Sequence, residues 1–203
     1  MLLLNLVLVA ALVIVGLTAD SLGVLAAGVD YLADAAAIGV SLLAIRLSRQ
    51  DFRKRTSGYP NPTDFAALIN AGWLLVLTIG VAVAAIRRLV SGTAEVRGMP
   101  VLIVSGIAAL AMLVGAVILG GELDGDNGGQ DLNIKAVLLD TAADAAAAAG
   151  VASTGAVIVV TGGWYWLDPA VALAIAVVFG YHAGQLIWRV LIALRTPPSQ
   201  TPD

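Results

Sequence analysis

The chain has no cysteine, one histidine and few charged residues, and each scarcity excludes a class of protein. Of its 203 residues, 12% are charged and 60% are hydrophobic. Without cysteine there are no disulfides and no thiolate metal sites, and the lone His182 cannot form a site of several imidazoles. An ordinary soluble domain carries about twice this share of charge. The composition therefore predicts an integral membrane protein whose surroundings are the lipid bilayer, with no bound cofactor and no nucleic-acid partner.

Long apolar runs alternate with short polar breaks along the whole sequence. A helix needs about 20 apolar residues to cross a bilayer core. The first run lacks a basic leader and a small-residue cleavage site, so we interpret it as a retained helix and not as a signal peptide. We expect an all-α six-helix transmembrane domain over 1–196 and a disordered tail over 197–203. The six predicted spans are 2–19, 23–46, 65–90, 100–120, 134–161 and 167–193.

Lysine and arginine are divided unevenly between the two sides that these spans define. The side of the N-terminus receives Arg46, Arg49, Arg53, Lys54, Arg55, Lys135, Arg189 and Arg195, and the other side receives Arg87, Arg88 and Arg97. Cytoplasmic loops are the richer in basic residues, so both termini are predicted to be cytoplasmic in a multi-pass protein of the plasma membrane. The aromatic run 164–166 then falls at the outer interface, where amphipathic rings are favoured.

Two spans carry a pair of aspartates four residues apart. Residues 30–34 read DYLAD and residues 140–144 read DTAAD. Residues with this spacing share one face of a helix. An ionised aspartate at the centre of a bilayer costs about 2.5–3.5 kcal/mol on insertion scales, so these four side chains are not expected to face lipid. They must face the interior of the bundle, carry protons or meet a cation.

The same two spans are rich in small residues, at Ala35–Ala37 and Ala145–Ala149. Such surfaces let helices approach closely, so spans two and five are predicted to pack together. The two pairs would then form one site of four carboxylates, Asp30, Asp34, Asp140 and Asp144. Carboxylates suit hard divalent cations, and clustered carboxylates retain protons when no cation is bound. Because the same carboxylates can hold either a divalent cation or protons, the sequence predicts a transporter that exchanges a divalent metal ion for protons.

Other readings of the four acids stay open at this stage. The aspartates could hydrogen-bond neighbouring helices in a membrane scaffold that transports nothing. A monovalent cation/proton antiporter would also use intramembrane acids, although it needs fewer of them. An intramembrane aspartyl protease shares a proton between two acids, but it needs one acid per helix in a glycine-rich frame that this chain lacks.

The sequence resembles the cation diffusion facilitators over almost its whole length. The resemblance is carried by the region DSLGVLAAGVDYLADAAAIGVSLLAIRLS, by GYPNPTDFAALINAGW at the head of the third span, and by DLN, GWYW and DP around the fifth and sixth spans. It implies a homodimeric exporter of divalent cations that works by proton exchange and alternating access. The family's metal ligands fall on Asp30, Asp34, Asp140 and Asp144.

The chain departs from the pattern of the family's zinc members at three places. Both pairs begin with Asp where histidine is common, which favours Mn²⁺ or Fe²⁺, with Zn²⁺, Co²⁺ or Cd²⁺ also possible. The family's usual cytoplasmic domain after the sixth helix is not in this sequence, and that domain commonly helps to hold family dimers together. The loop before the fifth span is acidic instead of histidine-rich. We interpret it as a solvated segment, and the alternative is that its acids collect cations weakly: Glu122, Asp124, Asp126 and Asp131.

The remaining polar residues receive structural interpretations. His182 is expected to pack or to hydrogen-bond at an interface, and Asn5 and Asn70 to join helices. Asp64 lies where the family often has an acid, but the basic residue that usually precedes it is missing. Asp168, just before Pro169, is expected to cap its own helix, the sixth.

Overall fold

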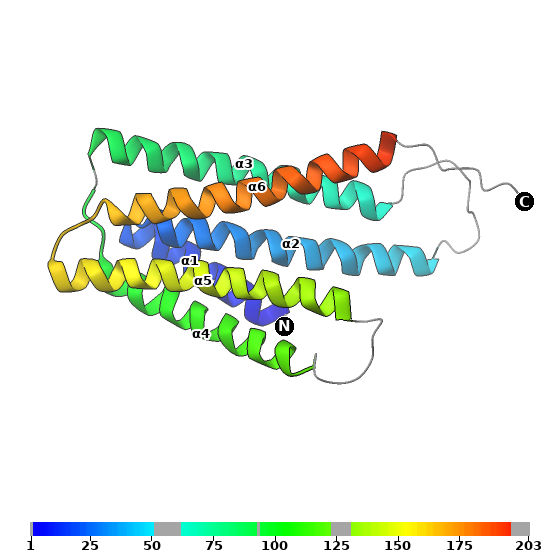
Figure 1. Ribbon diagram of the computed structural model, residues 1–203, viewed down its shortest axis with the longest axis horizontal. Coiled ribbons are helices and arrows are strands. Elements are labelled where there is room, and N and C mark those ends of the chain that lie inside the picture. Colours follow the sequence, from blue (N-terminus) through cyan, green and yellow to red (C-terminus); the bar gives the residue numbers. More distant parts are fainter. Residues whose placement is uncertain (1, 51–61, 93, 123–130, 196–203) are drawn as a thin grey trace, which may run out of the picture.

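The computed structural model describes residues 2–50, 62–92, 94–122 and 131–195. This part of the chain is all α, as the composition predicts, and contains no strand (Figure 1). Its helices are α1 (Leu2–Ala19), α2 (Leu22–Gln50), α3 (Pro62–Ser91), α4 (Gly98–Glu122), α5 (Asp131–Thr161) and α6 (Leu167–Arg195). The tail and most of the acidic loop lie outside the described residues, as do the side chains of Asn5, Asp64 and Asp131.

The six helices occupy the six predicted places, and several extend further than the apolar runs. Helix α2 continues to Gln50 and α5 begins at Asp131, because polar residues outside a bilayer core can continue a helix that starts within it. Proline stands at the first position of α3, where its missing N–H has no intrahelical partner to lose. Consecutive helices run in opposite directions, so α2 and α5 are antiparallel (Figure 1).

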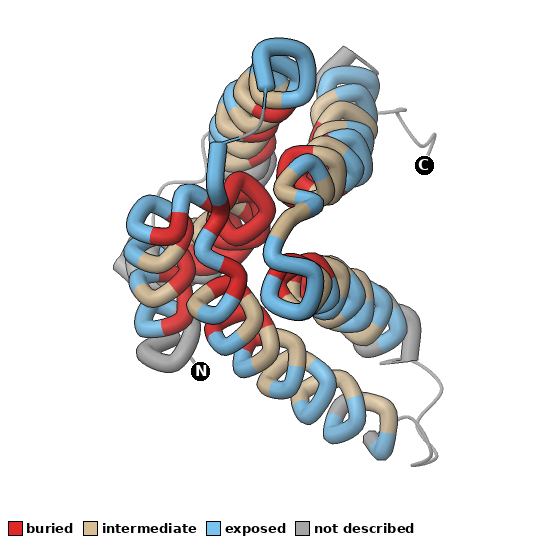
Figure 2. The backbone as a smooth tube through the Cα atoms, turned by 90° about the vertical axis from the view of Figure 1, so that its left-hand side faces the viewer, coloured by how far each residue is buried: buried red, intermediate tan, exposed pale blue. Residues whose placement is uncertain are grey.

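The helices associate most extensively in three pairs, α1 with α2, α3 with α6, and α4 with α5. The view along the bundle shows buried residues where the helices face one another and exposed residues on the outside (Figure 2). Two glycines explain how closely α4 and α5 approach. A Cβ atom on Gly155 would lie 2.6 Å from the backbone nitrogen of Leu102, and one on Gly98 would lie 2.9 Å from the carbonyl oxygen of Gly155. Only glycine fits at this crossing.

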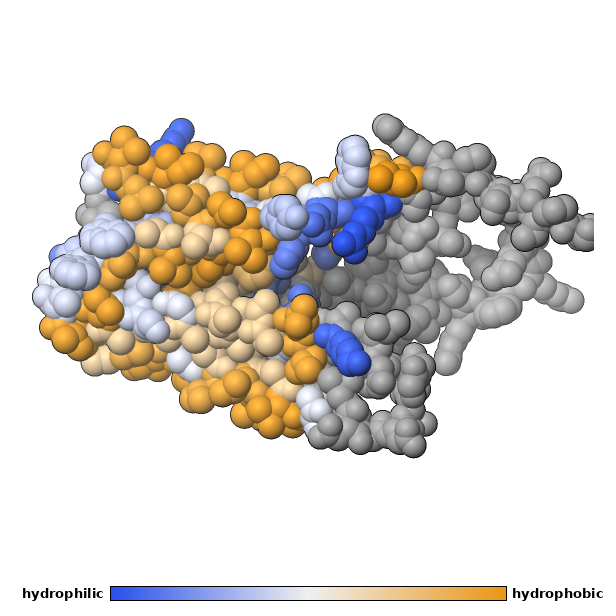
Figure 3. All heavy atoms as spheres, viewed as in Figure 1, coloured by the Kyte–Doolittle hydropathy of each residue, from blue (hydrophilic) through white to orange (hydrophobic). Residues whose placement is uncertain are grey.

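Within the described residues, four helices are long and apolar enough to span a membrane, over Leu68–Ser91, Gly98–Ile118, Leu138–Thr161 and Leu167–Arg189. In α1 and α2 the apolar stretches within the described residues, Leu6–Ala19 and Leu22–Ala33, are shorter. Large apolar side chains cover much of the outer surface, as a lipid environment requires (Figure 3). Hydrophilic side chains gather near the middle of the same face (Figure 3). The structure is a membrane-protein bundle.

Candidate metal centre

One aspartate from each predicted pair lies at the contact between α2 and α5. Asp30 on α2 is 7% exposed, and Asp144 on α5 is 5% exposed. Their side chains are hydrogen-bonded to each other. An ionised carboxylate only accepts hydrogen bonds, so a bond between two carboxyl groups requires a proton on one of them. The bundle thus brings together two acids that are 114 positions apart in the sequence.

The other two aspartates lie one helical turn away on the same side of this pair. Asp140 precedes Asp144 on α5, and Asp34 follows Asp30 on α2, so antiparallel helices carry both toward the same end of the bundle. Asp140 is exposed. The side chain of Asp34 lies outside the described residues. Among the side chains that are described, no three acids or histidines form a group that could hold a metal ion.

Beyond the Asp30–Asp144 pair, toward the start of α2, the helices are closely packed. Val24 on α2 and Ala148 and Val151 on α5 are fully buried at this level. The predicted contact between spans two and five is therefore present. Each of the two helices packs more extensively against its chain neighbour, however, α2 against α1 and α5 against α4. The close approach at Gly98 and Gly155 explains why α5 packs more extensively against α4 than against α2.

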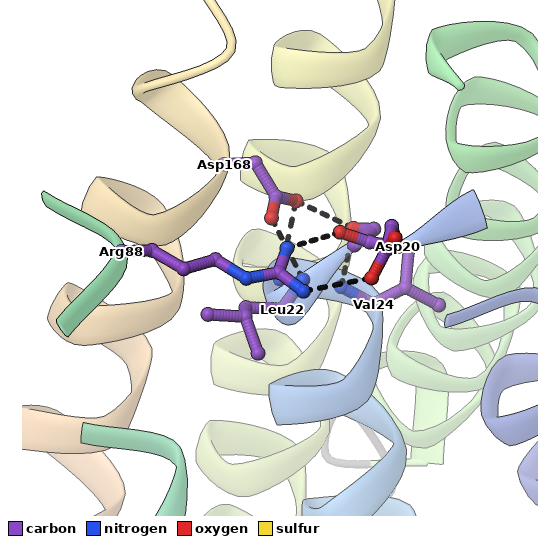
Figure 4. A network of polar contacts seen from close by, with 7 residues as sticks. Asp20, Leu22, Val24, Arg88 and Asp168 are labelled. Carbon is purple, nitrogen blue, oxygen red and sulfur yellow. Dashed lines mark hydrogen bonds and ion pairs between the residues drawn. The ribbon is translucent and has the colours of Figure 1, made fainter. Parts of the chain in front are cut away.

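Asp168 does not cap its own helix, contrary to the sequence-based expectation. Its carboxylate is fully buried and reaches the N-terminus of α2 instead (Figure 4). The hydroxyl of Ser21 donates to it at 2.5 Å, and the backbone N–H groups of Leu22 and Gly23 donate at 2.7 and 3.2 Å. A helix start presents N–H groups without intrahelical partners, and here a residue of another helix satisfies them. The local pattern, Asp before Pro, could not reveal a partner 145 residues away.

Arg88 near the end of α3 makes a second polar contact between helices at the same end of the bundle. Its guanidinium forms an ion pair with Asp20 at 2.8 Å and also donates to the backbone carbonyl of Asp20 (Figure 4). Asp20 has a left-handed backbone conformation, with φ of 60°, in the turn between α1 and α2. The backbone N–H of Arg97 donates to the carbonyl of Ala19 at 3.1 Å. The sequence had suggested only a role in membrane orientation for these arginines.

A profile of the cation efflux transmembrane domain matches residues 1–194. The chain belongs to the cation efflux family. This is the family that the DYLAD, DTAAD, DLN and GWYW motifs resemble. Its match covers all six helices, so the aspartate pairs and the Asp168 contact lie within the matched domain.

Several relatives have transport activities in their names. The chain is 32% identical to "Zinc transporter ZitB" of Yersinia pestis over 87% of its length and 54% of that protein. It is 28% identical to the "Cadmium, cobalt and zinc/H(+)-K(+) antiporter" of Bacillus velezensis, over 82% of this chain and 53% of the relative. It is 30% identical to "Metal cation efflux system protein CzcD" of Cupriavidus metallidurans, over 80% and 50%. The chain spans about half the length of these relatives.

Family membership settles several of the open readings. The relatives are transporters and not enzymes, which removes the aspartyl protease from the alternatives. The membrane-spanning helices and the bacterial cation efflux relatives make this chain a multi-pass protein of the plasma membrane. The homodimer stays a prediction, as does the disordered tail.

His182 lies on α6 within this cation efflux domain and is exposed. Its ring lies 6.1 Å from that of Tyr181, measured between centroids. It belongs to no group of metal-binding side chains among those described. The expectation that it packs or hydrogen-bonds at an interface stays a prediction. Asn70 is half-buried on α3, and its role in joining helices stays a prediction.

Proposed function

We propose that this chain exports a divalent metal ion from the cytoplasm in exchange for protons, with Asp30, Asp34, Asp140 and Asp144 as the metal ligands. The observation that carries the proposal is the hydrogen bond between Asp30 and Asp144. Two buried carboxyl groups that share a proton form a group that a cation can compete for. Membership of the cation efflux family supports the same reading.

Charge balance gives the coupling between metal and proton. Four ionised carboxylates in a bilayer would repel one another strongly, so the empty site holds protons. A divalent cation would neutralise part of the negative charge and displace the proton shared by Asp30 and Asp144. When the metal leaves, the carboxylates recover protons from the side on which the site is then open. Each cycle therefore moves metal one way and protons the other.

The distribution of exposure suggests how the metal enters. Asp140 is exposed whereas Asp144, one turn further along α5, is buried. An aspartate is not stable against hydrocarbon, so its exposure favours a watery approach from this end. The basic residues predict that this end faces the cytoplasm. On the opposite side of the pair, buried Val24 and Val151 close the path. This is the arrangement expected of a transporter open to the cytoplasm.

The donor set decides which metals to test. A site with only carboxylate oxygens favours hard cations, and we propose Mn²⁺ or Fe²⁺ on this ground. The names of the relatives point to zinc, cadmium and cobalt. Divalent affinity for a given site generally rises from Mn²⁺ toward the end of the first-row series, so Zn²⁺ and Co²⁺ belong in the same comparison.

The test uses the full chain reconstituted in liposomes that contain a pH-sensitive dye. Each of Mn²⁺, Fe²⁺, Co²⁺, Zn²⁺, Cd²⁺ and Mg²⁺ is added outside, and proton movement is recorded. Asp144→Asn removes the carboxylate with little change of shape and is expected to abolish metal-driven proton flux. Ser153→Ala is the matched control, because its exposed hydroxyl lies on the same helix and bonds only the carbonyl of Ala149 in the described structure. Proton flux that persists in Asp144→Asn would contradict the ligand assignment.

A further inference from the structure

The N-terminus of α2 is held by a residue of α6, at a place outside the proposed metal centre. Asp168 accepts hydrogen bonds from the Ser21 hydroxyl and from the N–H groups of Leu22 and Gly23 (Figure 4). The same Ser21 hydroxyl accepts the N–H of Val24 at 3.1 Å. Three successive N–H groups at the start of α2 are therefore satisfied by this one cluster. Ser21 supplies half of an ordinary helix cap, and α6 supplies the rest.

This contact fixes more than the helix end. Three hydrogen bonds that converge on one buried carboxylate set the height of α2 beside α6 and its rotation about its own axis. A carboxylate withdrawn from its donors while buried would lose both hydration and hydrogen bonds, which is costly. The ion pair of Arg88 with Asp20 holds the preceding turn to α3. The first turn of α2 is therefore attached to the α3/α6 pair.

The metal-site acid Asp30 lies on the same rigid helix, close to this attachment. Eight residues separate it from Leu22, a rise of about 12 Å along an α-helix. Gly23 shows how little freedom the helix has here. A Cβ atom at this position would lie 3.1 Å from Oδ1 of Asp168 and 3.4 Å from the methyl carbons of Val151 on α5. At this level the same face of α2 meets both Asp168 of α6 and Val151 of α5, so a shift of the carboxylate moves α2 against the helix that carries Asp144.

We propose that Asp168 is a positioning residue of the transport site: through Ser21 and the N–H groups of Leu22 and Gly23, it holds α2 at the height that places Asp30 opposite Asp144. The inference rests on the proposed function, because the property that it tunes is the affinity of that site for metal.

Two substitutions disturb the contact of Asp168 with the N-terminus of α2 in different ways. Asp168→Asn keeps the shape but sets an amide NH₂ among hydrogen-bond donors. Gly23→Ala removes no polar group and inserts a methyl against Oδ1 of Asp168. As a change of helix propensity alone, Gly→Ala favours the helix. A purely structural role therefore predicts no loss for Gly23→Ala, whereas a positioning role predicts weaker metal binding in both variants.

The experiment measures the KM of proton-coupled flux in liposomes for the divalent metal that the wild type transports fastest, after each variant is shown to be monodisperse. We expect KM to rise about tenfold in Asp168→Asn, the lower end of the losses seen when partners that orient metal ligands are removed. A smaller rise of the same kind is expected in Gly23→Ala. Ser21→Ala should also raise KM, and Ser21→Thr, which keeps the hydroxyl, should restore it. Ser153→Ala is again the control, with KM unchanged.

The outcomes separate the inference from the proposed function. If wild-type protein moves no protons with any divalent metal, the proposed function is wrong. If wild-type protein transports, and folded Asp168→Asn and Gly23→Ala keep the wild-type KM, Asp168 serves stability alone and the inference is wrong. Should Asp168→Asn fail to fold, Gly23→Ala and the Ser21 pair still decide the question. A KM that is raised in Asp168→Asn and Gly23→Ala and unchanged in Ser153→Ala supports the positioning role.

Discussion

Replacing Gly155 by alanine should destabilise the bundle, because α4 and α5 cross at this residue. The added Cβ would meet the backbone nitrogen of Leu102 at 2.6 Å and the carbonyl oxygen of Gly98 at 3.0 Å. Both obstacles are backbone atoms, so no side-chain rotation can relieve the overlap. The two helices must separate instead. Gly150→Ala on the same helix is the matched control, since its Cβ would lie 3.9 Å from the methyl carbon of Val171.

The expected difference between these two variants follows from the overlap. Both gain about 1 kcal/mol from replacing glycine with alanine inside a helix, so this term cancels in the comparison. Forcing an extra carbon into a packed interface typically costs about 1–3 kcal/mol. For a chain of this size, 1 kcal/mol corresponds to roughly 2–4 °C in the unfolding midpoint. We therefore expect Gly155→Ala to unfold about 2–12 °C below Gly150→Ala.

The assay is intrinsic tryptophan fluorescence of the two purified variants and the wild type, heated at one rate in the same detergent. The wild type should lie at or above Gly155→Ala and at or below Gly150→Ala. Equal midpoints for the two variants would mean that α4 and α5 are not in close backbone contact at Gly155. The account of the α4/α5 pair would then be wrong.

Two further predictions concern the orientation and the acids. Because the chain has no cysteine, Arg97→Cys and Arg189→Cys can each be tested for labelling by an impermeant maleimide on intact cells. Arg97→Cys should react directly, and Arg189→Cys should react only after permeabilisation. The reverse pattern would invert the predicted topology. Asp140 is exposed and Asp144 is buried, so Asp140→Asn should raise the KM for metal while leaving transport measurable, whereas Asp144→Asn should abolish it. Equal losses in both variants would count against the different roles given to these two acids.

The helices were predictable from the sequence because their signal is local. Each apolar run is long enough to identify a span, and the structure adds only polar extensions such as the end of α2 at Gln50. The contact between Asp30 and Asp144 was also within reach, since carboxylates in a bilayer must find partners and each helix offers a small-residue face.

The contacts of Asp168 and Gly98 were not predictable in this way. Asp168 stands before Pro169 at a helix start, which is the ordinary pattern of a local cap, and nothing nearby indicates Ser21 as its partner. Gly98 is preceded by polar residues and reads as part of a loop, yet it begins α4 and allows the crossing with Gly155. Each of these contacts joins residues of helices that are far apart in the sequence. A single sequence shows the composition of each helix but not which helices pack together.

The central claim is that a metal ion displaces the proton held between Asp30 and Asp144. Calorimetric titration of the purified chain with Zn²⁺ or Mn²⁺, in two buffers of different ionisation enthalpy at the same pH, counts the protons released on binding. The account predicts that wild-type protein releases protons as it binds metal and that Asp144→Asn neither binds as tightly nor releases as many. Metal binding by the wild type with no proton release would contradict it.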